Sequence, residues 1–227
     1  CMILMIGVAS PASSAQAATV TIVATGLNNP RHLAFGPDGA IYVAEAGKGG
    51  AGPCVNGPEG RTCFGNTGSI TKIWHGGQAR VVRGLPSAAS PDGSFAIGPH
   101  DVSAIWSSIQ VQDHRALDYF VLIGGGFLRP ALGKSGVNFG RLIKIRPDGV
   151  RRSKADLWTY EKQHDPAGDG ADSNPYALLT LRGRHIIADA GGNSLLKVRR
   201  SDGRISTLAT FPKRMVPGPD GQLVRMD

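Results

Sequence analysis

The sequence predicts an all-β protein and, within that class, part of a β-propeller. Three observations lead to this fold class: short apolar segments of strand length, tight turns rich in glycine and proline, and a unit of four such segments that occurs three times. Of the 227 residues, 41% are apolar and 32 are glycines, which suits a packed core with many turns. No window sustains the helical period of an amphipathic helix.

The three units, here called blades 1, 2 and 3, span residues 31–85, 99–157 and 175–211. We expect strands at 31–35, 40–44, 69–74 and 79–85 in blade 1, at 100–105, 118–123, 141–145 and 151–157 in blade 2, and at 176–181, 184–188, 194–198 and 204–211 in blade 3. Apolar alternation within them is imperfect, as expected for sheets buried on both faces. Such sheets must stack around an axis, and a β-sandwich of two halves would not need three matched units.

Residues 18–227 are expected to form only part of a propeller. The segment Val20–Leu27 ends in Gly-Leu, as does the last strand of blade 1, and it predicts a lone outer strand. In a closed propeller, the other three strands of that blade come from the far end of the chain, which removes an open edge. Since three blades cannot close a ring, we expect a complete protein of about 350–400 residues with six blades.

The first 17 residues, CMILMIGVASPASSAQA, are predicted to be a signal peptide that lacks its charged beginning. The apolar run Met2–Ala9 is too short to span a bilayer, and the small residues after it end in the cleavage pattern Ala15-Gln16-Ala17. A lipid-anchored Cys1 is less favoured, because such a cysteine is usually followed by a polar tether. We therefore expect a secreted or periplasmic protein without a membrane span.

Cys54 and Cys63 lie in the glycine-rich segment GPCVNGPEGRTCFG. Export to an oxidising compartment permits a disulfide between them. It would close a loop of roughly ten residues and contribute about 2–3 kcal/mol. A metal site is less favoured, because two thiols without a nearby histidine or third cysteine are a poor zinc ligand set.

The formal net charge is +8 and the isoelectric point is about 9.8. Basic proteins can meet nucleic acids or anionic surfaces. Here the Lys and Arg residues are scattered, and the densest groups are the pairs Arg151-Arg152 and Arg199-Arg200. With no basic stripe and no interleaved aromatic residues, nucleic-acid binding is not expected.

Propeller topology predicts where a functional site would lie. The loop that leads into the innermost strand and the loop that leaves the second strand meet at one end of the barrel, called here the axial face. The residues expected there are Asn29, Arg31, His100, Asp101, Asn174 and Tyr176 before the innermost strands, and Glu45, Asp189 and Asn193 after the second strands. Glu45 and Asp189 occupy matching places, but blade 2 has Ile123 there, so the ring of acids is incomplete.

Two interpretations of these polar residues stay open. Glu45, Asp189, Asn174 and Asn193 offer the hard oxygen ligands of a divalent-cation site, most plausibly for calcium. Alternatively, they hydrogen-bond to the backbone at the strand ends and hold the blades together. His100, in GPHDVS, has the residue type of a general base, or it is a structural histidine with satisfied hydrogen bonds.

An acidic segment, EKQHDPAGDGADSNP, joins blades 2 and 3. It carries Glu161, Asp165, Asp169 and Asp172 within twelve residues. The spacing does not fit an EF-hand, which needs acids at alternate positions and a distal glutamate. The sequence predicts a solvated, cation-sensitive loop. No nucleophile elbow, phosphate-binding loop or dinucleotide fingerprint is present in the chain.

A family resemblance adds to these observations. LNNPRHLAFGPDGAIYVAEAGKGG, GPCVNGPEGRTCFG, IGPHDVS, FGRLIKI, DSNPYALL and ADAGGNSLLKV occur in this order and together resemble the ScyD/ScyE family of secreted bacterial proteins. The resemblance covers residues 19–212 and implies an NHL-like six-bladed propeller and export. It implies little chemistry, because fold does not determine function.

Two functions follow as expectations. The first is a secreted binding or scaffold propeller, monomeric, that holds a small molecule, a glycan or a partner protein on its axial face. The alternative is a calcium-dependent hydrolase or lyase of the lactonase-like propeller type, with Glu45, Asp189 and Asn174 on the cation and His100 as acid or base. A quinone-dependent sugar dehydrogenase is less favoured, because the chain lacks a clear pocket of histidine and arginine for the quinone.

Overall fold

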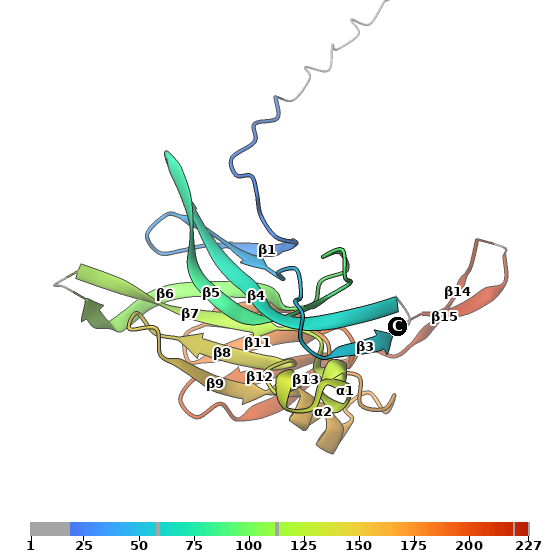
Figure 1. Ribbon diagram of the computed structural model, residues 1–227. Helices are drawn as coiled ribbons and strands as arrows, with labels where there is room; N and C mark the ends of the chain where they lie inside the picture. Colours follow the sequence, from blue (N-terminus) through green and yellow to red (C-terminus); the bar gives the residue numbers. More distant parts are fainter. Residues whose placement is uncertain (1–18, 58–59, 112–113, 220, 227) are drawn as a thin grey trace, which may run out of the picture.

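The computed structural model describes residues 19–57, 60–111, 114–219 and 221–226. Strands make up 54% of the chain and helices 10%, so the predicted all-β class is confirmed. The strands form three antiparallel sheets of four or more strands and one separate hairpin (Figure 1). The predicted signal peptide, residues 1–17, lies outside the described residues.

Each predicted blade corresponds to one sheet. Blade 1 contains β1 (Pro30–Phe35), β2 (Ile41–Glu45), β4 (Gly60–Trp74) and β5 (Gly77–Ala89), with β3 (Cys54–Gly57) added alongside β4; blade 2 contains β6 (Pro99–Val111), β7 (His114–Ile123), β8 (Arg141–Ile145) and β9 (Arg151–Asp156); blade 3 contains β10 (Pro175–Leu181), β11 (Arg184–Asp189), β12 (Ser194–Arg199) and β13 (Ile205–Thr210). In blades 2 and 3 the strand order in space is the order in the chain. This meander is the arrangement of a propeller blade.

The first strands of the three blades lie next to one another. Strand β6 packs against β1 on the side of blade 1 and against β10 on the side of blade 3. The three sheets do not close a ring within the described residues, so the six-bladed propeller stays a prediction.

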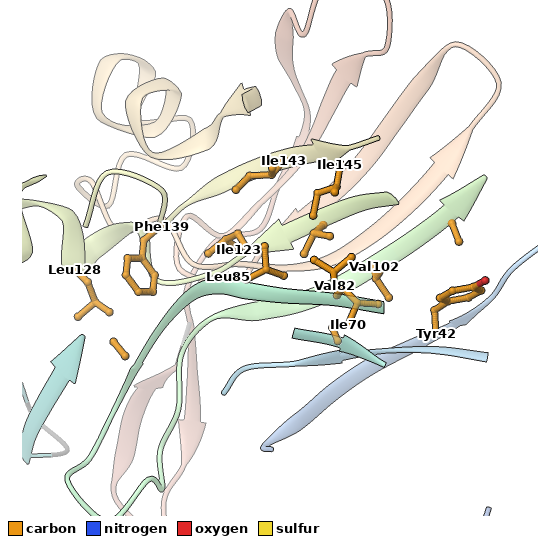
Figure 2. Packing of buried hydrophobic residues seen from close by; sticks show 14 of the residues in the cluster. Tyr42, Ile70, Val82, Leu85, Val102, Ile123, Leu128, Phe139, Ile143 and Ile145 are labelled. Atoms are coloured by element: carbon orange, nitrogen blue, oxygen red, sulfur yellow. The ribbon is translucent and has the colours of Figure 1, made fainter. Parts of the chain in front are cut away.

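Blade 2 is buried on both faces. One apolar cluster joins it to blade 1 and includes Val121 and Ile143, whereas a second cluster joins it to blade 3 and includes Phe120 and Leu142. Neighbouring residues on β7 and on β8 therefore point into different cores, because side chains alternate across a strand. Figure 2 shows the first cluster, with Ile143 close to other labelled side chains. Burial on both faces explains why the sequence lacks a clean alternation of apolar and polar residues.

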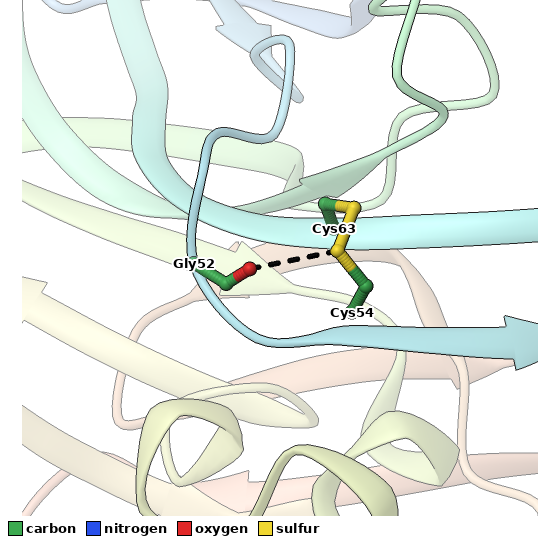
Figure 3. Close-up of a disulfide and its surroundings, with 3 residues drawn as sticks. All are labelled: Gly52, Cys54 and Cys63. Atoms are coloured by element: carbon green, nitrogen blue, oxygen red, sulfur yellow. Dashed lines mark hydrogen bonds between the residues drawn. A yellow bond between two sulfur atoms is a disulfide. The ribbon is translucent and has the colours of Figure 1, made fainter.

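Strands β4 and β5 extend well beyond the predicted blade. The extension forms an arm in which Cys54 lies directly opposite Cys63 and the two form a disulfide (Figure 3). The predicted disulfide is thus present, but the segment around it is a hairpin rather than an irregular loop. Its glycines serve close backbone packing, since a Cβ at Gly65 would lie 2.2 Å from the carbonyl oxygen of Gly49.

Short helices occur where the sequence predicted none. A turn of 3-10 helix, η1 (Gly126–Leu128), leads into α1 (Arg129–Leu132) and η2 (Gly133–Gly136) after blade 2's second strand. Helix α2 (Leu157–His164) follows β9, so the predicted strand 151–157 ends one residue early. Asp156 caps α2, because its Oδ1 accepts a hydrogen bond of 3.0 Å from the backbone N–H of Thr159. The hairpin of β14 (Arg214–Pro217) and β15 (Leu223–Met226) comes last.

The predicted lone outer strand at 20–27 is wrong for this structure. Residues 19–29 form no strand, and Val20 is 88% exposed. A strand needs a neighbouring edge for its backbone hydrogen bonds, and this segment pairs with no strand among the described residues. Side chains of β5 hold the segment instead: the amide of Gln78 exchanges two hydrogen bonds with the backbone of Thr25, and Arg80 donates to the carbonyl of Gly26.

In the part of the chain that the structure describes, no helix has the length and apolar character needed to cross a membrane.

Candidate functional site

The first strand of every blade carries a β-bulge at the same place. The proline that opens each strand pairs with the last residue of the second strand, and the register then shifts, between Pro30 and Leu33, Pro99 and Asp101, and Pro175 and Ala177. Arg31 and His32 lie inside the first shift, His100 inside the second and Tyr176 inside the third. A bulge disturbs the ladder and re-aims the side chains at that place. Arg31, His100 and Tyr176, each directly after its proline, are therefore free to point away from their sheets.

These three bulge residues meet at one cavity of about 600 Å³, called here the axial cavity. Its lining comes from all three blades and from the disulfide arm: Arg31, Val55, Gly60, Thr62, Phe95, Ala96, Ile97, His100, Phe127, Leu128, Asp172, Asn174 and Tyr176. The volume is in the range of small-molecule sites, and so is the mixture of an apolar wall with a few polar groups. Of the residues predicted for the axial face, Arg31, His100, Asn174 and Tyr176 line this cavity.

His100 is fixed and neutral at the base of the cavity. It is 3% exposed, and burial lowers its pKa to about 4, with further lowering by Arg31 and His32. Its Nδ1 lies 3.0 Å from the carbonyl oxygen of Pro175, which can only accept, so Nδ1 carries the proton and Nε2 is an acceptor. A Cβ at Gly124 would lie 2.1 Å from the His100 ring, so the glycine there lets the ring pack against the backbone. So low a pKa makes His100 a weak general base at neutral pH.

Three aromatic rings connect the blades beside the cavity. The ring of Tyr176 meets His32 at 4.8 Å and His100 at 5.1 Å between centroids, both nearly edge-on. Nδ1 of His32 lies 3.1 Å from the carbonyl oxygen of His100. Each histidine thus contacts the backbone of the next blade, and the blades are held in a fixed relation around the cavity. Arg31 adds a hydrogen bond from its guanidinium to the carbonyl of Ala96.

Asn174, Asn29 and Asp101 make backbone contacts between segments. Oδ1 of Asn174 accepts a 2.9 Å hydrogen bond from the N–H of Gly125, which leaves the amide nitrogen of Asn174 to donate. Asn29 has a positive φ of 50° and donates to the carbonyls of Gly47 and Gly93. Oδ2 of Asp101 accepts from the N–H of Leu178 in blade 3 at 2.7 Å. Of the three, only Asn174 lines the axial cavity.

Glu45 is engaged by a full set of donors inside blade 1. Its carboxylate is fully buried and accepts hydrogen bonds from Ser69, Thr71, the N–H of Asn28 and the guanidinium of Arg80, which lies 2.7 Å away. Burial alone would raise the pKa of Glu45, but these donors together lower it below its usual value. Because its oxygens are held in this way, Glu45 fits the second interpretation of the sequence, in which the polar residues form hydrogen bonds at the strand ends, better than the role of a metal ligand.

Asp189 has the matching place in blade 3 but different partners. Its Oδ2 accepts from Ser173 at 2.6 Å, and its Oδ1 accepts from the N–H groups of Asn174 and Gly192. Burial raises the pKa of Asp189 above its usual value. Asn193, with a positive φ of 45°, donates to Asp169 at 3.4 Å. The predicted metal ligands are thus divided between two blades, and no group of three His, Cys, Asp or Glu among the described residues could hold a metal.

The acidic segment is not a solvated loop throughout. Glu161 lies on α2 and is fully buried, which corrects the prediction for this residue. Asp165 ends the helix in a left-handed conformation and accepts from the N–H groups of Asp169 and Gly170. The capping residue Asp156 was a signal for this helix, but it lies inside the strand expected at 151–157.

A second cavity, of about 670 Å³, lies between blades 1 and 2 near the turns that contain Asp38 and Pro147. These turns are at the other end of the strands from Glu45 and Asn29, so this cavity holds none of the predicted site residues. Many of its cations are already paired: Lys72 with Asp38 at 2.7 Å, and Arg146 with a carboxylate of its own turn. The axial cavity is the better candidate, because its polar groups keep donors and acceptors for a ligand.

The buried state of His100 predicts a pH dependence. The unfolded chain takes up a proton on this histidine near its ordinary pKa of 6.5, but the folded protein does so only near 4. The contribution of His100 to the free energy of unfolding should therefore fall as the pH is lowered from about 6.5 to 4. His100→Asn should make this slope shallower, whereas His75→Asn, at an exposed turn, should leave it unchanged. Urea unfolding at a series of pH values measures the slopes, and equal slopes for wild type and His100→Asn would contradict the assignment.

Compared with known proteins, the chain matches no protein-family model and no curated protein sequence. The resemblance to the ScyD/ScyE family therefore stays a prediction, and the candidate site rests on its own geometry. Sequence reasoning missed the apolar wall of the cavity, which includes Val55, Phe95 and Phe127. These residues come from loops and from the disulfide arm, where no repeat marks their position.

Proposed function

We propose that this protein is a secreted binding propeller that holds a small organic ligand in the axial cavity. The observation that carries the proposal is the meeting of three equivalent bulge residues, Arg31, His100 and Tyr176, at one cavity of about 600 Å³. One residue from each blade points to the same space and none of the three is part of the ladder. The disulfide, typical of exported proteins, supports secretion.

Among the polar groups of the cavity, Arg31 and Asn174 favour a ligand with an anionic or hydrogen-bonding end, whereas Asp172 opposes an anion close to it. Arg31 supplies a positive charge, and the free amide hydrogens of Asn174 supply donors. His100 offers only the acceptor Nε2, because its single proton is used toward Pro175. A carboxylate or a sulfonate can accept from Arg31 and Asn174 together, and bonds to charged groups are the stronger ones.

The apolar groups favour a flat, hydrophobic body for the same ligand. Phe95 is 62% exposed and Phe127 is 39% exposed, which is high for phenylalanine. Both line the cavity, together with Leu128. An aromatic ring placed between them would remove their surface from water, at about 25 cal/mol for each Å² of apolar surface buried. The class that fits both parts is an aromatic acid.

The proposal is tested with 8-anilinonaphthalene-1-sulfonate, an aromatic anion that fluoresces when it enters an apolar site. We expect saturable binding to the folded protein and competition by simple aromatic carboxylates such as indole-3-acetate. Arg31→Gln should weaken binding about tenfold or more, because it removes a charged hydrogen-bond donor. Phe127→Ala should also weaken it.

Arg184→Gln is the matched control, since it removes the same charge from an exposed position of β11, outside the cavity. Equal affinity of the wild type, Arg31→Gln and Arg184→Gln would exclude the axial cavity as the binding site. Circular dichroism of each variant verifies that the fold is retained before binding is compared.

A further inference from the structure

Glu161 is a buried carboxylate without a partner. Its side chain is fully buried, and neither of its oxygens has a hydrogen-bond donor among the described residues. It lies one helical turn after Leu157 on the buried face of α2, a position where an apolar residue would be expected. A buried charge that is neither paired nor hydrogen-bonded costs several kcal/mol, so this group requires an explanation.

The surroundings of Glu161 are strongly negative. Burial and the charges of Asp189, Asp165 and Asp172 together raise its pKa to about 7. It also lies in the last turns of α2, the end of a helix that carries the negative pole of the helix dipole. In the part of the chain described, neither Glu161 nor Asp189 forms an ion pair. Asp169, in the same acidic segment, is paired with Lys213 at 3.6 Å.

Two buried carboxylates approach each other at the start of blade 3's third strand. A Cβ at Gly192 would lie 2.8 Å from Oε2 of Glu161, and the N–H of the same Gly192 donates to Oδ1 of Asp189 at 3.2 Å. The hydroxyl of Ser194, which is opposite Asp189 in the ladder, is also buried without a partner. Gly192 therefore lies between the carboxylates of Glu161 and Asp189, and the oxygens of Glu161 have no donor among the described residues.

Comparison of blade 3 with blade 1 shows what is different. In blade 1 the buried acid Glu45 pairs with Ser69, and two residues later Thr71 pairs with Arg80, whose guanidinium neutralises the acid. In blade 3 the buried acid Asp189 pairs with Ser194, and two residues later Leu196 pairs with Thr207. Thr207 therefore has the ladder position that corresponds to Arg80. Thr207 carries no charge, and it bonds instead to the hydroxyl of Tyr160 on α2. In blade 3 a second acid, Glu161 of α2, lies near Asp189, and no cation among the described residues is paired with either carboxylate.

We propose that Glu161 and Asp189 bind a calcium ion at the junction of helix α2 with blade 3. The ion takes the part that Arg80 has beside Glu45 and supplies the positive charge that blade 3 lacks. Calcium fits better than magnesium, because it accepts irregular sets of six to eight oxygen ligands that include hydroxyl and carbonyl groups. This site is separate from the axial cavity, whose lining includes neither Glu161 nor Asp189.

Two measurements on the intact protein test the site. The first is the melting temperature at about pH 8, where Glu161 is charged, with and without calcium after treatment with EDTA. We expect calcium at about one hundred times its dissociation constant to raise the melting temperature by about 5–10 °C, and magnesium to raise it less. The second is terbium luminescence, because Trp158 and Tyr160 lie shortly before Glu161 on α2 and can sensitise a bound terbium ion. Calcium should then displace the terbium and remove the signal.

Two variants assign the response to these residues. Glu161→Gln should abolish the calcium shift and the terbium signal, while the metal-free melting temperature stays the same or rises because a buried charge has been removed. Gly192→Ala keeps both carboxylates but places a methyl group 2.8 Å from Oε2 of Glu161, and it should weaken calcium binding at least tenfold. Asp148→Asn, which removes one charge from a half-exposed turn of blade 2, should respond to calcium as the wild type does.

Three outcomes would overturn the proposal. The first is a wild-type protein that shows neither a calcium shift nor a terbium signal. The second is an equal calcium response in wild type and Glu161→Gln, which would place the ion elsewhere. The third is a melting temperature that rises as the pH falls from 8 to 5 without any response to calcium. In that case a proton on Glu161 would be sufficient to neutralise the buried carboxylate, and no metal ion would be needed.

Discussion

Replacing Arg80 with methionine is expected to lower the free energy of unfolding by about 3 kcal/mol. The substitution leaves Glu45 fully buried without its counter-ion, and breaking a buried pair in this way typically costs about 3–5 kcal/mol. The lower end applies because a quarter of the Arg80 side chain is exposed (25%) and water can partly replace it. The melting temperature should fall by about 6–12 °C, measured by calorimetry or circular dichroism.

The double variant Glu45→Gln/Arg80→Met is the control for this experiment. It removes both charges, so it should be more stable than Arg80→Met alone, because no buried carboxylate is left without a counter-ion. The pKa of Glu45 is lowered in the folded protein, so the pair stabilises above the ordinary pKa of 4.5 and this contribution is lost as the pH falls further. A double variant as unstable as the single one would show that packing of the arginine, rather than its charge, is what matters.

Phe139→Ala is expected to cost about 3–5 kcal/mol, the range for removing a buried phenylalanine side chain. Phe139 is fully buried and meets the ring of Phe64 edge-on, with 6.3 Å between centroids. It lies close to Leu128, a residue of the cavity wall (Figure 2). The substitution should therefore lower the urea midpoint and also weaken binding of the aromatic anion to the axial cavity.

Two further variants make the Phe139 prediction specific. Phe139→Leu keeps much of the apolar volume and should cost only about 1–2 kcal/mol. Phe35→Ala removes the same ring from a strand where it is 73% exposed, and it should cost well under 1 kcal/mol. An equal loss of stability for Phe139→Ala and Phe35→Ala would contradict the assignment of Phe139 to the buried core.

The blade strands could be predicted from the sequence because each repeats the same turn signals. Pro-Asp-Gly turns and the proline before the first strand occur in matching positions, and turn chemistry fixes the ends of strands. The axial placement of Arg31, His100 and Tyr176 followed from the same repeat. The β-bulge that turns these side chains into the cavity is a shift in the pairing of two strands, and a repeated sequence pattern does not reveal such a shift.

Three features could not be predicted, each for a physical reason. The arm around Cys54 and Cys63 is rich in glycine, which usually indicates a loop, but here glycine allows two backbones to approach closely. Helix α2 has a single turn of apolar contact and no sustained period. The burial of Glu161 contradicts the usual preference of glutamate for water, and only tertiary packing of α2 on blade 3 reveals it.

The shared position of the three bulges has a consequence for engineering. A residue outside the hydrogen-bonded ladder can be exchanged without disturbing the sheet around it. Arg31 meets this condition, whereas Tyr176 packs on His32 and His100, and His100 is fixed by its contact with Gly124 and by its bond to Pro175. A library of all amino acids at position 31 would therefore vary the recognition surface on a constant scaffold, with His100 and Tyr176 as fixed points beside it.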